Sequence, residues 1–147
     1  MDELNQKIYE KAIQLLSIRL HTTGELQQKL ANRGFASNEI IPILKRLEEL
    51  KFLDDERFAQ IFVDNLKRYK DFGYYGIRAK LLKARIPSNI AERALSEFFT
   101  VEDEIVVAKR LVSKLKRQGR EDWKKLTASL ANRGFRADAT REATSSL

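Results

Sequence analysis

The chain has 147 residues, of which 43% are apolar and 33% charged, and its net charge at pH 7 is +7. It contains no cysteine, which excludes disulfide bonds, thiolate metal sites and cysteine nucleophiles. No apolar run approaches the roughly 18 residues of a membrane span, and the acidic N-terminus lacks a signal-peptide core. We therefore expect a cytoplasmic protein without a membrane segment.

The first third of the chain predicts three helices. Apolar side chains recur every three or four positions over Ile8–Leu20, which is typical of a helix with one buried face. Thr22 followed by Glu25 matches a capping box and predicts that a second helix begins directly after Thr22. Gly34 should end that helix, because glycine adopts the left-handed cap conformation most readily. We expect Ser37 to cap a third helix.

The same signals return twice further along the chain. Asp54 and Thr100 each precede acidic residues that suit the start of a helix, so each is expected to cap the first helix of a new triplet. Ser88, preceded by Pro87, is expected to cap the last helix of the second triplet. The closing stretch Asp138–Leu147 has only alanines before its final leucine. Its helix is therefore expected to be short, frayed or absent.

A sequence repeat organises these elements. The hexapeptide Leu-Ala-Asn-Arg-Gly-Phe occurs at residues 30–35 and again at residues 130–135, and residues 77–86 hold a degraded copy of residues 26–35. Upstream of each copy lies an apolar helical run around one alanine, at Ala12, Ala59 and Ala108. We predict an all-α fold of three tandem, helix-turn-helix-like triplets in an elongated, curved array. We name them module 1 (residues 1–51), module 2 (residues 52–99) and module 3 (residues 100–147). A triplet of this size has a marginal core of its own, so neighbouring modules are expected to share apolar surface.

Positive charge is distributed unevenly over the modules. Basic residues exceed acidic ones by one in module 1, eight against seven, and by four in module 3, eleven against seven. The candidate contact residues within the two main basic runs are Lys67, Arg68, Lys70, Arg78, Lys80, Lys83, Arg110, Lys114, Lys116 and Arg117. The positive electrostatic field of such runs favours binding to nucleic acid or to an acidic protein surface. The alternative interpretation of either run is a helix face that is simply exposed to solvent.

Residues typical of catalysis are scarce. The single histidine, His21, follows the first helix and is expected to cap it or to interact with its dipole. The acidic run Asp54–Glu56 is expected to form a helix start rather than a metal site, because adjacent helical positions do not converge on one point. The segment Gly73–Gly76 lacks the lysine and hydroxyl residue of a phosphate-binding loop. We therefore expect no enzyme, no cofactor and no metal.

The distribution of charge also bears on DNA reading. Helix-turn-helix readers place one helix in the major groove with exposed basic or amide side chains. Here the third helices carry mixed charge, and the positive charge lies on second helices and at the ends of first helices. This argues against base reading and favours contacts to phosphates or to an acidic protein along an extended track. Tyr74 and Trp123 occupy equivalent positions near the basic runs, where packing and stacking on single-stranded nucleic acid are both open.

Several segments together resemble the RecX family of recombinase regulators: Ala12–Leu20, Glu25–Leu30, Phe52–Ala59, Gly73–Leu81 and Arg133–Phe135. The resemblance covers essentially the whole chain, and the two segments in module 2 are fairly specific. It implies a fold of three tandem three-helix repeats, in agreement with the sequence repeat. Two departures stand out. Lys83–Ile86 lacks the glycine usual before the apolar residue, and the final helix is less apolar than the family pattern.

The resemblance implies a non-enzymatic regulator of recombination in DNA repair and the SOS response. Family members associate with the nucleoprotein filament of a RecA-type recombinase, lie along its groove and restrain its growth, ATP hydrolysis, strand exchange and co-protease activity. On this reading the ten basic residues named above contact the filament, and the protein acts as a monomer without cofactors. Arg57 lies in a matched segment, where an intrahelical ion pair is an equal alternative. The competing interpretation is a non-specific DNA-binding protein that contacts the phosphates of single- or double-stranded DNA.

Overall fold

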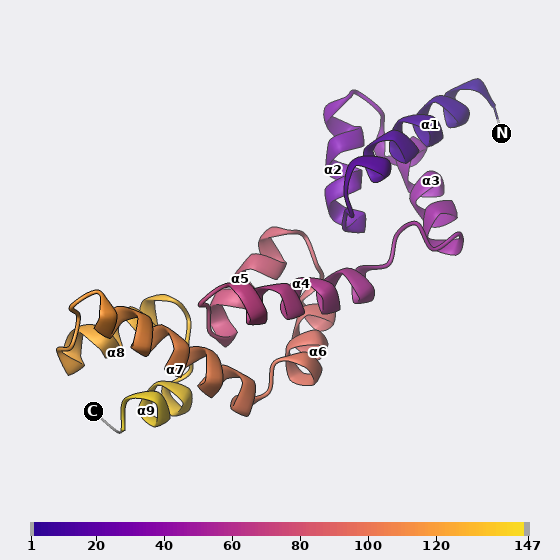
Figure 1. Ribbon diagram of the computed structural model, residues 1–147. Helices are drawn as coiled ribbons and strands as arrows, with labels where there is room; N and C mark the ends of the chain where they lie inside the picture. Colours follow the sequence, from indigo (N-terminus) through magenta and orange to yellow (C-terminus); the bar gives the residue numbers. More distant parts are fainter. Residues whose placement is uncertain (1, 146–147) are drawn as a thin grey trace.

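The computed structural model describes residues 2–145. All regular structure within this range is α-helical, which confirms the predicted fold class. The helices form an elongated, curved array, and the two ends of the described chain lie far apart (Figure 1). Their bounds are α1 (Glu3–Ile18), α2 (Thr23–Asn32), α3 (Ser37–Glu49), α4 (Asp55–Tyr69), α5 (Tyr74–Lys83), α6 (Ser88–Phe98), α7 (Val101–Arg117), α8 (Trp123–Asn132) and α9 (Ala137–Thr144).

The helices follow one another as the triplets α1–α3, α4–α6 and α7–α9, for which we keep the names modules 1 to 3. Local caps set where several of them begin. The Thr22 hydroxyl accepts the backbone N–H of Glu25 (3.0 Å), and the Glu25 carboxylate accepts the N–H of Thr22 (3.0 Å), as predicted. The side chains of Asp54 and Thr100 also accept backbone N–H groups, at the starts of α4 and α7. Gly34 follows α2 in the predicted left-handed conformation, with a φ of +96°.

Two predicted caps are wrong. Ser37 and Ser88 are the first residues of α3 and α6, and neither side chain caps its helix. At α3 the carboxylate of Glu39 accepts the N–H of Ala36, the residue before the helix (3.2 Å), and no side chain caps the first turn. At α6 the residue before the helix is Pro87, whose ring fixes φ at −56° and favours a helix start.

The first helix is shorter than predicted, and part of the predicted last helix lies outside the described range. α1 ends at Ile18, so Leu20 lies beyond it and is 57% exposed. α9 is present and short, with eight residues. Residues 146 and 147 of the predicted final helix lie outside the described residues. Within residues 2–145, no helix combines the length and the apolar character that crossing a membrane requires.

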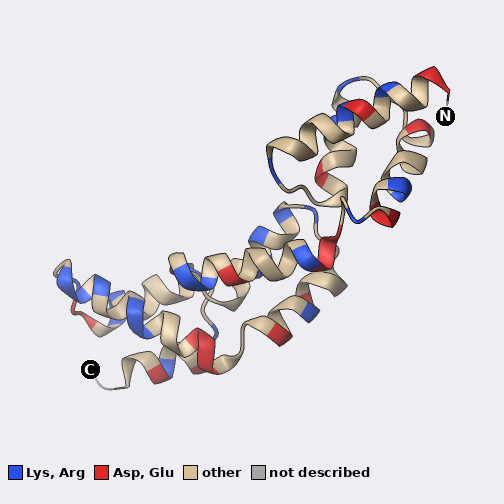
Figure 2. Ribbon diagram, turned by 45° about the vertical axis from the view of Figure 1, so that its right-hand side comes forward, with Lys and Arg blue, Asp and Glu red and all other residues tan. Residues whose placement is uncertain are grey.

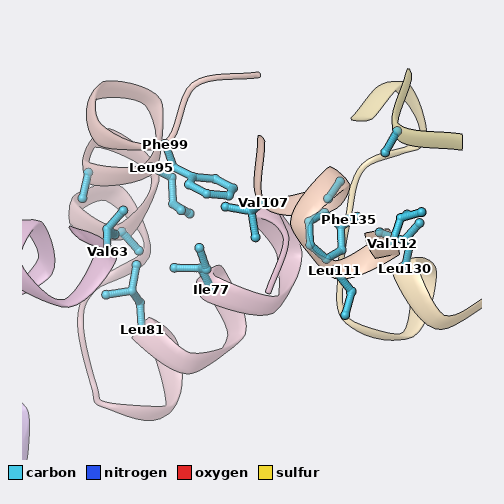
Figure 3. Packing of buried hydrophobic residues seen from close by; sticks show 14 of the residues in the cluster. Val63, Ile77, Leu81, Leu95, Phe99, Val107, Leu111, Val112, Leu130 and Phe135 are labelled. Carbon is cyan, nitrogen blue, oxygen red and sulfur yellow. The ribbon is translucent and has the colours of Figure 1, made fainter. Parts of the chain in front are cut away.

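Apolar side chains form two separate cores. The first packs α1 against α2 and α3 through residues such as Ile8, Leu26 and Leu47. The second runs without a break through modules 2 and 3, where Phe99 and Val107 lie at their boundary (Figure 3). Modules 2 and 3 therefore share apolar surface, as predicted. Modules 1 and 2 do not share a core among the described residues.

Candidate partner-binding surface

Each module is joined to the next by the same structural element. The N-terminus of the second helix in one module meets the turn between the second and third helices of the following module. At junction 2–3, the Gly73 N–H donates to the carbonyl of Arg133 (3.0 Å), and the Tyr75 N–H donates to that of Gly134 (2.8 Å). A side chain at Gly73 would collide with the backbone of Phe135, so this close approach requires glycine.

A buried carboxylate completes junction 2–3. Glu104 on α7 accepts hydrogen bonds from the N–H of Tyr74 (2.8 Å), the N–H of Arg136 (3.0 Å) and Nε of Arg136 (2.6 Å). The guanidinium of Arg136 also lies 4.2 Å from the centre of the Tyr74 ring. Glu104 is fully buried, and these contacts offset the removal of its charge from water.

Junction 1–2 repeats this plan with fewer contacts. The Thr22 hydroxyl donates to the carbonyl of Ala84 (2.7 Å), and the Thr23 N–H donates to the carboxylate of Asp55 (2.8 Å). Asp55 and Glu104 are equivalent, because each lies four residues before the alanine that the modules share. Neither junction role is predicted above. Their common position relative to the repeated alanine is the sequence signal that could have revealed it.

Two of the ten predicted contact residues hold the end of α4. The Nε atom of Arg110 contacts Asp71 (3.1 Å), and its Nη2 donates to the carbonyls of Lys67 (3.0 Å) and Lys70 (2.7 Å). The ammonium of Lys114 pairs with the carboxylate of the same Asp71 (3.3 Å). Arg110 and Lys114 therefore fasten the C-terminus of α4 to α7.

Three more of the predicted residues have partners within the protein. The ammonium of Lys67 donates to the carbonyl of Phe98 (3.0 Å) at the link between modules 2 and 3. Arg78 pairs with Glu92 (3.2 Å) and so connects α5 to α6. Lys80 lies 4.5 Å from the centre of an aromatic ring of its own module. These side chains stabilise the array, and a partner would compete for them.

The remaining five predicted residues have no ion pair in the part of the chain that the structure describes. They lie at or directly after the C-terminal ends of α4, α5 and α7, and at least part of each is exposed. We call them the free basic set: Arg68, Lys70, Lys83, Lys116 and Arg117. Figure 2 shows lysine and arginine recurring along modules 2 and 3. This spacing offers several cationic contacts to one extended partner rather than a single pocket.

The two equivalent aromatic residues differ in exposure. Tyr74 is partly buried against the core of modules 2 and 3, whereas Trp123 is 57% exposed at the start of α8. Trp123 also lines an open groove of about 640 Å³ between α8 and α9. Packing therefore accounts for Tyr74, and stacking stays open for Trp123 alone. Arg57 is exposed and forms no ion pair among residues 2–145.

His21 is a buried group with two hydrogen-bond partners. Its Nδ1 donates to the carbonyl of Arg19 (2.9 Å), where α1 ends, and its Nε2 accepts from the ammonium of Lys29 (2.7 Å). Burial lowers the pKa of His21 from its usual value, because it disfavours the charged imidazolium. This arrangement agrees with a capping role. The described residues contain no group of histidine and acidic side chains placed to hold a metal ion.

Known proteins are similar to this chain over nearly its whole length. The family model described as RecX, first three-helix domain, matches residues 9–47, and the model of the second three-helix domain matches residues 54–95. The regulatory protein RecX of Prosthecochloris aestuarii is 35% identical over 96% of this chain and 93% of its own length. That of Geobacillus kaustophilus is 29% identical over 80% of this chain and 43% of its own length.

Solved structures show the same architecture. The crystal structure of RecX from Lactobacillus salivarius superposes with a TM-score of 0.91 at 27% identity, covering 100% of this chain and 98% of that chain. A second crystal structure of a regulatory protein RecX gives a TM-score of 0.89 at 25% identity, covering 99% of this chain and 74% of that one. These matches extend through module 3, which the two family models leave uncovered. The chain belongs to the RecX family.

Proposed function

We propose that this protein binds the nucleoprotein filament of a RecA-type recombinase and restrains its ATP hydrolysis, strand exchange and co-protease activity. One observation carries the proposal: over 96% of its length the chain is similar to relatives named regulatory protein RecX. Membership of this family implies a regulatory role toward the recombinase. The inhibitory direction and contact with the filament itself are the parts that experiment has to test.

The shape of the molecule supports such a partner. Equivalent modules in series present basic helix ends at intervals, and a filament presents equivalent sites on successive subunits. Several weak contacts made at once bind far more tightly than any one of them, provided that the spacings match. The fifteen residues of α4 alone span about 22 Å, so the array reaches well beyond one contact point.

We assign the direct contact to the free basic set. The five predicted residues that bond internally position α4, α5 and α7, whereas the free basic set can form new ion pairs without breaking old ones. Cationic side chains at helix C-termini also face the negative end of the helix dipole, an interaction that stabilises the helix end. The proposal therefore separates residues that shape the array from residues that meet the partner.

Charge reversal tests this assignment. The triple variant Arg68→Glu, Lys70→Glu and Lys83→Glu should weaken filament binding about tenfold or more and should lose inhibition of the recombinase ATPase. A control with the same change in net charge is Lys7→Glu, Arg33→Glu and Lys45→Glu, at exposed positions of module 1. Both should keep their helical circular dichroism. Unchanged inhibition by the first triple variant would show that this surface does not contact the filament.

A second candidate function, non-specific DNA binding, is favoured by the end of module 3. There Trp123 is exposed next to the exposed side chains of Arg120, Lys124 and Lys125. Aromatic stacking beside basic residues is typical of single-strand binding. Affinities for recombinase filaments and for naked single-stranded DNA, measured across a salt series, separate the two functions. Equal affinities would favour DNA binding, and preference for the filament would favour recombinase regulation.

A further inference from the structure

A small cavity lies between modules 1 and 2. Its volume is about 100 Å³, a size that suits one aliphatic side chain. Residues of both modules and of the link between α3 and α4 line it: Leu20, His21, Lys51, Phe52, Asp54, Arg57 and Phe58. The cavity is therefore placed where any occupant would touch module 1 and module 2 together.

Two apolar side chains of this lining are largely exposed. Leu20 is 57% exposed and Phe52 is 51% exposed. The backbone fixes Phe52 in this position, because its N–H and that of Leu53 both donate to the carbonyl of Leu47 (2.9 and 3.3 Å), and Leu53 takes the buried site. Exposed apolar side chains held beside a cavity are typical of surfaces that bind another protein.

Junction 2–3 shows what junction 1–2 lacks. His21 and Phe72 are equivalent, since each directly precedes the cap of a second helix, and Phe58 and Val107 are equivalent, since each directly precedes the shared alanine. Phe72 packs against the continuous core of modules 2 and 3, and Val107 is buried within it. At junction 1–2 the imidazole of His21 and the partly buried Phe58 instead border the cavity. The polar His21 thus takes the place that the apolar Phe72 has at junction 2–3.

The lining also carries unpaired positive charge. Lys51 and Arg57 are exposed, and neither forms an ion pair within the described range. The carboxylate of Asp54 is already engaged with the N–H of Arg57 (3.1 Å) as the cap of α4. A carboxylate on the partner would therefore meet two available cations. A nucleic acid backbone offers the negative charge but no aliphatic group to fill the cavity, so the combination favours protein.

We propose that this cavity receives an aliphatic side chain of a protein partner, and that a neighbouring carboxylate of that partner pairs with Lys51 and Arg57. The inference rests on the proposed function only for the identity of the partner, a subunit of the recombinase filament. The inserted side chain supplies the apolar contact that junction 1–2 lacks. Docking therefore also fixes module 1 relative to module 2.

A short peptide tests the site without recombinase. The probe is an acetylated and amidated Asp-Leu-Glu tripeptide, titrated to millimolar concentration and followed by ¹H–¹⁵N NMR. We expect shifts at the amides of Leu20, Phe52 and Arg57. The double variant Leu20→Ser and Phe52→Ser should bind the peptide about tenfold more weakly or worse. The control Val106→Ser, at a valine of α7 that is also largely exposed, should bind like the unaltered protein. Absence of localised shifts, or equal binding by the double variant, overturns the proposal.

Filament binding by the same variants identifies the partner. We expect the double variant and Arg57→Glu to bind recombinase filaments about tenfold more weakly than the unaltered protein and Val106→Ser. If the unaltered protein and the double variant bind filaments equally, the assignment of the filament to this cavity is wrong. If the peptide binds and filaments do not, the proposed function fails while the cavity remains a protein-binding site. A dimer in sedimentation that the double variant abolishes would make a second copy the occupant and overturn the proposal.

Discussion

Junctions 1–2 and 2–3 follow one plan and differ in what they bury. At junction 2–3, Glu104 is fully buried in three hydrogen bonds, and the apolar core continues across it. At junction 1–2, the equivalent Asp55 is partly exposed and accepts one cross-module hydrogen bond, and the two cores are separate. Apolar burial is the main source of stability, so modules 2 and 3 should unfold together and module 1 apart from them. The repeat thus places equivalent residues at both junctions and determines which parts of two modules meet. The groups buried at each junction determine how strongly the two modules are held together.

The largest expected effect comes from removing the junction carboxylates. Glu104→Ala leaves the N–H groups of Tyr74 and Arg136 and the partly buried guanidinium of Arg136 without their acceptor, so it should lower the free energy of unfolding of modules 2 and 3 by about 3–5 kcal/mol. Asp55→Ala removes one hydrogen bond at a partly exposed site and should cost about 1 kcal/mol. Urea unfolding followed by circular dichroism measures both. Similar losses in the two variants would contradict the difference drawn between the junctions.

The repeated hexapeptide allows a sharper comparison. A side chain at Gly134 would collide with the backbone of Gly76 across junction 2–3, whereas one at Gly34 would meet no atom within 4 Å. Both glycines have positive φ, of +82° and +96°, so alanine is strained at either position. Gly134→Ala should therefore cost about 3 kcal/mol and Gly34→Ala about 1 kcal/mol. The same unfolding measurement ranks them, and an equal cost would show that junction 2–3 relaxes to accept the methyl group.

The smallest expected effect is a pH dependence confined to module 1. The pKa of His21 is lowered from 6.5 in the folded protein because burial disfavours the charged form, so the unfolded chain binds a proton more readily. Its contribution is fully present above pH 6.5 and is lost as pH falls below that value. The lowered pKa values of Glu25 and Asp103 act at more acidic pH, because their usual values are 4.5 and 3.8.

Unfolding midpoints at about pH 8 and about pH 5.5 measure this effect. The midpoint of module 1 should fall on acidification, and that of modules 2 and 3 should stay nearly constant, because His21 is the only histidine of the chain. In the control variant His21→Asn, the midpoint of module 1 should no longer depend on pH over this interval. An equal shift of both midpoints would assign the effect to other groups.

Helix starts could be predicted from the sequence where the capping group is close in the chain. Thr22, Asp54 and Thr100 all bond a backbone N–H three residues ahead, so a short pattern reveals them. The errors at Ser37 and Ser88 have the same local origin. A serine is a good cap in isolation, but in both cases the preceding residue occupies the cap position and the serine is already the first helical residue.

The candidate contacts could be predicted from the sequence only as a larger group of basic residues. Lys67, Arg110 and Lys114 bond to groups between 31 and 43 positions away, and no short pattern reveals such partners. The same limit hides the junction role of Glu104, whose partners lie 30 and 32 positions away. The repeat itself carries that information, because residues in equivalent positions of successive modules meet equivalent neighbours.

The two ends of the described array differ from its internal junctions. The position equivalent to Asp55 and Glu104 is Ile8 in module 1, which is buried and cannot accept a hydrogen bond from a preceding module. At the other end of the array, the second helix of module 3 has Lys124 at the position of Gly24 and Lys125 at the position of Gly76. These two glycines lack a side chain and so permit the close approach of the backbones at junctions 1–2 and 2–3. Neither end therefore repeats the residues that form the internal junctions. Head-to-tail stacking of copies through this contact would lack the junction carboxylate and would place lysine side chains where the junctions have glycine, which disfavours open-ended polymerisation.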